Sequence, residues 1–197
     1  MRFAGRLSRT AFAELVDKRH DEIRAATGLL ALYGLAGWSG PARIGSWGWE
    51  NGVLSTAGLA FGVPAGPGPW AEVVTTAGPA EEWVYDQRLA AALAAQPPQD
   101  DETFQRVVDA VEAVRPAELA LDVDGVVRTF RHWPARDGHP GWYAALAGAP
   151  GLAVAARGLE PREVRLVPVA DVEPYLAAAR VDVLTTYDAA QPPPDRP

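Results

Sequence analysis

Residues 42–61 have the sequence ARIGSWGWENGVLSTAGLAF, in which Asn51-Gly52 separates two strand-like runs. Both residues tolerate a positive φ angle, so this dipeptide is typical of the two-residue turn of a β-hairpin. Asp124-Gly125 gives the same signal between ELALDV and VVRTFRHW. Tight turns join antiparallel neighbours, whereas parallel strands need long crossover connections. The sequence therefore predicts a largely antiparallel sheet.

Helical periodicity marks several further segments. The clearest is 101–115, whose apolar stripe consists of Phe104, Val107, Val108, Val111 and Val114. Helices are also predicted over 10–26 and 79–95 and from about residue 172. The predicted fold class is α+β: an antiparallel sheet of roughly five to eight strands in two meander or hairpin segments, with about four helices packed mainly on one face.

The domain organisation follows from length and from two Pro-rich stretches. A chain of 197 residues is long enough for one good core or for two lobes that share one. We predict a single globular domain over residues 1–188, with possible lobes 1–95 and 102–188 joined by the linker QPPQDD. The Pro-rich, polar residues 189–197 are predicted to form a disordered tail.

Composition excludes several classes of function. The net charge is −7 and the basic residues are scattered among acids, so we expect no nucleic-acid partner. The chain has no cysteine, which removes disulfides and thiolate metal sites. The first apolar positions are interrupted by Glu14, Asp17 and Lys18, so we expect no leader, no membrane association and a cytoplasmic location. Lys18 is the only lysine beside many alanines, glycines, prolines and arginines, which is typical of a GC-rich bacterial genome.

The chain has seven tryptophans, and two of them lie in the first hairpin. Trp47 and Trp49 are two residues apart and would point the same way in a regular strand. If exposed, the pair would stack on a sugar or on a partner's side chain, with Glu50 and Asn51 nearby. If buried, it would belong to the core. Both interpretations stay open.

Residues 131–145, RHWPARDGHPGWYAA, hold two of the three histidines. His132, Asp137 and His139 supply two nitrogens and one carboxylate, the ligand count of a catalytic zinc or iron site. The histidines are seven residues apart, however, and helical metal motifs use i, i+4. Asp137-Gly138 is also common turn chemistry. We therefore prefer a surface hairpin loop, expect no metal or other cofactor, and keep these three residues as alternative catalytic or metal-ligating candidates.

Other enzyme signatures fail. GWSGP around Ser39 resembles a nucleophile elbow, but its second glycine is displaced. His20 lies on a charged helix face, where we expect it to be solvated. No phosphate-binding loop or dinucleotide fingerprint occurs.

The first hypothesis is therefore a non-catalytic binding protein with a protein partner, such as an adaptor or an immunity-type inhibitor. Its candidate contact residues are Trp47, Trp49, Trp133 and Trp142. One alternative is a metal-assisted hydrolase that uses the loop of His132 and His139. Another is a small-molecule binder with a tryptophan-lined pocket, which would need a concave site.

Overall fold

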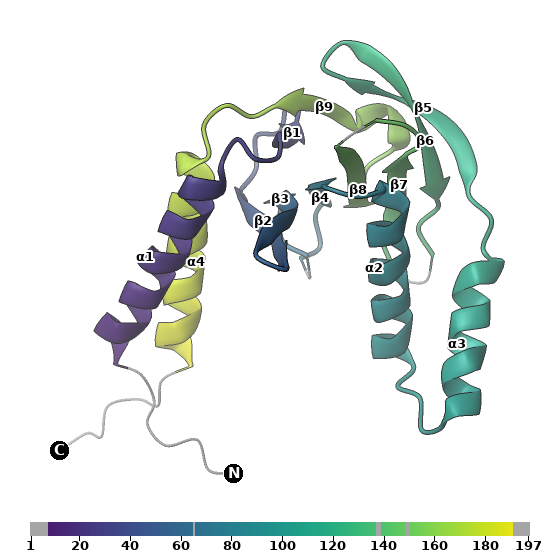
Figure 1. Ribbon diagram of the computed structural model, residues 1–197, viewed down its shortest axis with the longest axis horizontal. Coiled ribbons are helices and arrows are strands. Elements are labelled where there is room, and N and C mark those ends of the chain that lie inside the picture. The colour runs from purple at the N-terminus through teal and green to yellow at the C-terminus, as the bar shows by residue number, and fades with distance from the viewer. Residues whose placement is uncertain (1–7, 65, 137–138, 149, 191–197) are drawn as a thin grey trace.

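The computed structural model describes residues 8–64, 66–136, 139–148 and 150–190. Within these residues the chain forms four α-helices around one curled sheet of nine strands (Figure 1). The helices are α1 (Arg9–Ala26), α2 (Ala80–Ala95), α3 (Asp101–Ala113) and α4 (Glu173–Ala189). The strands are β1 (Tyr33–Leu35), β2 (Ala42–Glu50), β3 (Val53–Phe61), β4 (Trp70–Thr76), β5 (Ala117–Val123), β6 (Val126–Trp133), β7 (Gly141–Ala145), β8 (Gly151–Arg157) and β9 (Arg165–Pro168).

The strand order is β1-β9-β5-β6-β7-β8-β4-β3-β2, and every neighbouring pair is antiparallel except β5 with β9. The α+β class is thus confirmed. Both predicted hairpin turns are present, with positive φ angles at Asn51-Gly52 and at Asp124-Gly125. The sheet has nine strands, one more than the upper end of the predicted range, and two of them, β1 and β9, are only three and four residues long. Pairing of β4 with β8 joins the strands before and after α2 and α3 into one sheet.

The helices cover both faces of the sheet, whereas the sequence analysis expected them mainly on one. Val154 of β8 belongs to the large core cluster on one face, while its neighbours Ala153 and Ala155 pack with Val84 of α2 on the other. A separate cluster beneath α1 and α4 joins the large core through Ile44 of β2. Figure 1 shows α1 beside α4 on one side of the molecule and α2 beside α3 on the other.

Residues 96–100, most of the predicted linker, connect α2 to α3, and these two helices pack on each other. Residue 189, the first of the predicted tail, is the last residue of α4. Residues 191–197 lie outside the described part of the chain, so the rest of the tail prediction falls outside it too.

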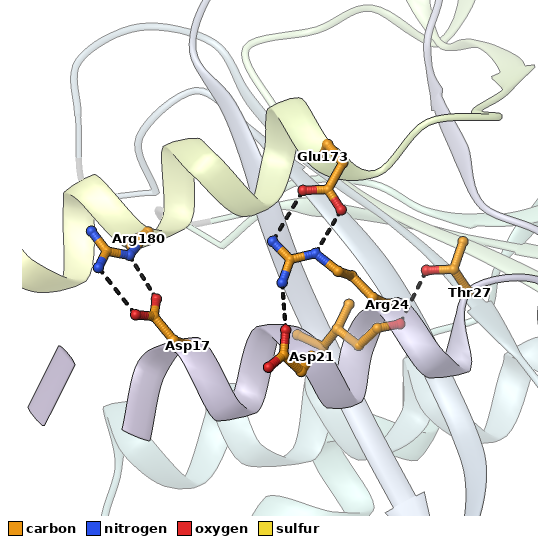
Figure 2. A network of polar contacts seen from close by, with 7 residues as sticks. Asp17, Asp21, Arg24, Thr27, Glu173 and Arg180 are labelled. Atoms are coloured by element: carbon orange, nitrogen blue, oxygen red, sulfur yellow. Dashed lines mark hydrogen bonds and ion pairs between the residues drawn. The ribbon is translucent and has the colours of Figure 1, made fainter. Parts of the chain in front are cut away.

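Helices α1 and α4 run antiparallel and are joined by ion pairs along their length (Figure 2). The pairs are Arg9 with Asp188 at 2.9 Å, Asp17 with Arg180 at 2.7 Å and Arg24 with Glu173 at 2.6 Å. The rings of Phe12 and Tyr187 stack between the same helices, with centroids 4.4 Å apart. The ion pairs are solvent-exposed, so each contributes little net stability.

His20 is buried beside this ion-pair network, with 7% of its surface exposed, so the prediction of a solvated side chain is wrong. It shares a helix face with Ile23 and Ala26, which pack into the cluster beneath α1 and α4. Burial, and then the positive charge of Arg24, lower the pKa of His20 below its ordinary value of 6.5. The fold therefore favours the neutral imidazole over the protonated one.

We expect this burial to make the protein less stable in mild acid. A folded-state pKa below the unfolded value means that the contribution of His20 is complete above about pH 6.5 and is lost as the pH falls below 6.5 and through the lower folded-state pKa. Urea unfolding at about pH 7.5 and about pH 5.5 measures the loss. His20→Gln should flatten this pH dependence, while Lys18→Gln, at an exposed site of the same helix, should leave it unchanged. An equal slope in His20→Gln and the wild type would contradict the assignment.

Candidate functional site

A cleft of about 410 Å³ lies between the α2–α3 helix pair and the ends of β6 and β7. Its volume falls within the usual range of small-molecule sites. Six of its apolar lining side chains form its floor and its two walls. They are Ala92 and Ala95 of α2, Val107 and Val111 of α3, and Trp133 and Trp142 of the sheet. We refer to this site as the α2–α3 cleft.

Trp133 and Trp142 form the floor of the α2–α3 cleft. They are direct cross-strand partners on β6 and β7, so their side chains lie on the same face of the sheet. Only 8% and 9% of their surfaces are exposed. Trp142 also meets Trp83 of α2 edge to face, with ring centroids 6.0 Å apart and an interplanar angle of 65°. The two predicted contact residues are therefore buried beneath a hollow instead of standing on an open surface.

The walls of the cleft come from the two helices. Alanines on the lining face of α2 project little, which leaves space between this helix and α3. Val107 and Val111 of α3 are buried, but Phe104, predicted in the same stripe, is 42% exposed. The stripe is divided because α3 packs mainly on α2 and not across the sheet.

Arg88, on α2, contacts both α3 and the tryptophan floor. Its guanidinium donates a hydrogen bond of 2.7 Å to the carbonyl oxygen of Val111. That carbonyl belongs to the last turn of α3, where the helix offers no partner of its own. The same guanidinium lies 5.1 Å from the ring centroid of Trp133, a cation–π geometry. Burial lowers the pKa of Arg88, although an arginine stays charged in proteins.

Arg136 and His139, from the described residues between β6 and β7, line one side of the mouth. The His139 amide donates a 2.8 Å hydrogen bond to the Arg136 carbonyl oxygen. Arg106 reaches the mouth from α3 and donates to the Thr103 hydroxyl at 3.1 Å. The mouth therefore carries cationic groups from two separate elements.

The two histidines proposed as metal ligands, His132 and His139, do not lie together in the structure. His132 stacks on Tyr143, with centroids 4.5 Å apart and planes 12° from parallel. These two residues are cross-strand partners, so they lie on the face opposite to Trp133 and Trp142. His139 lines the α2–α3 cleft, and Asp137 lies outside the described residues. Burial lowers the pKa of His132. Across residues 8–136 (without 65), 139–148 and 150–190, no three His, Asp or Glu side chains form a metal-binding group.

Trp47 and Trp49 lie far from this cleft in the strand order and are not among its lining residues. Trp47 is half-buried, packs against the cluster beneath α1 and α4, and donates through Nε1 to the Gly58 carbonyl oxygen at 3.3 Å. Trp49 is 39% exposed. A register shift between Gly48 and Trp49 interrupts the regular alternation of side chains, so the two indoles have different environments.

Sequence reasoning missed the walls and the mouth of the cleft, including Arg88, Arg106 and Arg136. The alanine run AAALAA at 90–95 is the one signal in the sequence of a helix face with little side-chain bulk. A helix of that composition does not show which element lies opposite to it.

In the comparisons with known proteins, the chain matches no protein-family model, no curated protein and no solved structure. Among the described residues, no helix combines the length and the apolar character required to cross a membrane.

Proposed function

We propose that this protein is a non-catalytic binding protein that holds a small, largely apolar molecule in the α2–α3 cleft. The observation that carries this proposal is a concave site with alanine and valine walls over a paired tryptophan floor. Sites of this kind bind ligands by surrounding them with apolar and aromatic side chains. Indole rings provide a large contact area with few rotatable bonds.

A small molecule has more support than the other two candidates. A protein-docking surface would use exposed aromatic side chains, and Trp133 and Trp142 are nearly covered by their own chain. A single metal centre would need His132 and His139 on the same side of the sheet, whereas one stacks on Tyr143 and the other lines the cleft. The tryptophan floor is accessible only to a ligand small enough to enter between the helices.

The test is binding of N-phenyl-1-naphthylamine, an uncharged dye whose emission rises in apolar surroundings. We expect saturable binding of one dye per chain by the wild type. Ala92→Phe places a ring in the cleft and should weaken binding at least about tenfold, because the dye and the new ring need the same space. Ala90→Phe makes the same change at an exposed site of α2 outside the lining, and should bind like the wild type.

Circular dichroism and thermal unfolding verify that both variants fold. Absence of dye binding by the wild-type protein would overturn the proposal. Equal binding by a folded Ala92→Phe variant would also overturn it, because the dye would then occupy some other site.

A further inference from the structure

Among the described residues that line the α2–α3 cleft, every charged side chain is a cation. These are Arg88, Arg106 and Arg136, and the same described lining includes no carboxylate. The chain as a whole has 25 acidic against 18 basic residues. The positive charge of the described lining residues is therefore opposite in sign to the net charge of the protein.

These arginines also differ from others in the chain in what they contact. Arg24, Arg131 and Arg180 each form an ion pair with a carboxylate at 2.6 to 2.7 Å. None of the three cleft arginines pairs with a carboxylate of the described residues. Arg88 contacts a backbone carbonyl and the face of an indole ring, and Arg106 contacts a hydroxyl group.

Two of the three arginines lie nearer to solvent than the tryptophan floor. Trp133 and Trp142 are the buried floor, while Arg106 and Arg136 are exposed residues that reach the lining from α3 and from the β6–β7 loop. Arg88 holds α3 to α2 through its hydrogen bond to Val111, so its side chain is fixed in place. Its charge adds to the positive electrostatic potential in the cleft. A molecule that complements this arrangement has an apolar body and a negatively charged end.

We infer that the ligand of the α2–α3 cleft is an amphipathic organic acid, bound as its anion. Its apolar body lies on Trp133 and Trp142, and its carboxylate meets the guanidinium groups of Arg106 and Arg136 at the mouth. Guanidinium groups bind carboxylates through paired, charge-assisted hydrogen bonds, which are stronger than those between neutral groups. This inference rests on the proposed function, since it names the chemical class of the molecule held there.

The experiment compares octanoate with octanol as competitors for the cleft-bound dye N-phenyl-1-naphthylamine. The two have equal chain length and differ only in the head group. We expect octanoate to displace the dye at about tenfold lower concentration than octanol. One charge-assisted hydrogen bond is enough to give a difference in affinity of this size. Raising sodium chloride from about 20 mM to about 300 mM should reduce displacement by octanoate and not by octanol, because salt screens exposed charges.

In the double variant Arg106→Gln/Arg136→Gln, octanoate and octanol should displace the dye at equal concentrations, each measured against the variant's own dye affinity. Arg162→Gln removes a positive charge outside the cleft lining and should keep the preference for octanoate. If the dye binds but octanoate and octanol compete equally in the wild type, the anion inference is overturned and the proposed function stands. A preference that persists in the double variant overturns it as well. If the dye does not bind at all, both fail.

Discussion

Trp142→Ala is expected to lower the free energy of unfolding by about 3–5 kcal/mol and to abolish dye binding in the α2–α3 cleft. Trp142 is 9% exposed, lies beside Trp133 across β6 and β7, and meets Trp83 edge to face. Its removal leaves a cavity that the paired strands cannot close, and it deletes half of the cleft floor. Urea unfolding measures the first effect, and titration with N-phenyl-1-naphthylamine measures the second.

Trp49→Ala is the matched control. It removes the same type of side chain at the end of β2. Trp49 is 39% exposed there and is not one of the residues that line the cleft. The loss of stability should be about 1 kcal/mol, since more than a third of this residue already faces solvent. Dye affinity should be unchanged. Equal destabilisation by the two substitutions would contradict the assignment of Trp142 to the packed floor.

Gly151→Ala is expected to destabilise the protein by about 2–3 kcal/mol although it adds a single methyl group. A Cβ atom at Gly151 would lie against the Thr76 hydroxyl, 2.5 Å from the Gly78 carbonyl oxygen and 2.8 Å from the Ala80 amide nitrogen. Two of these atoms belong to the backbone where β4 leads into α2, so they cannot move aside as a flexible side chain would. The methyl group must push the start of α2 away from β8, and α2 carries one wall of the cleft.

Gly68→Ala provides the control for the same chemical change. Nothing lies within 4 Å of a Cβ at that position, and its φ angle is outside the left-handed range. Its effect should be within about 0.5 kcal/mol. Chemical denaturation of the two variants under identical conditions makes the comparison. A Gly151→Ala variant as stable as the wild type would show that β8 and α2 are not in close contact at this point.

Local sequence signals predicted the local features of the fold. Asn51-Gly52 and Asp124-Gly125 identified two hairpins because each turn depends only on the conformational freedom of its own residues. The face that each helix covers depends on more distant partners. β8 is apolar at both Val154 and its neighbours, so its pattern gives no indication that one side packs on the main core and the other on α2.

The candidate site was predicted only in part for the same reason. The stretch 131–145 was identified by its aromatic and histidine residues, and it supplies Trp133, Trp142 and His139 to the cleft. The walls come from α2 and α3, which are distant in sequence. Arg88 and Arg106 belong to no motif, and their common orientation toward one cleft depends on the packing of the two helices.

The ion pairs between α1 and α4 discriminate between alternative alignments of the two helices, even though each adds little to stability. Their positions are separated by eight and then seven residues on both helices, which run in opposite directions. Sliding α4 along α1 by one turn, about 5.4 Å, would separate all three pairs at once and part Phe12 from Tyr187. Apolar contacts are non-directional, so they tolerate such a slip more readily than paired charges do. The charges therefore specify a single alignment for a helix pair whose apolar contacts alone would permit several.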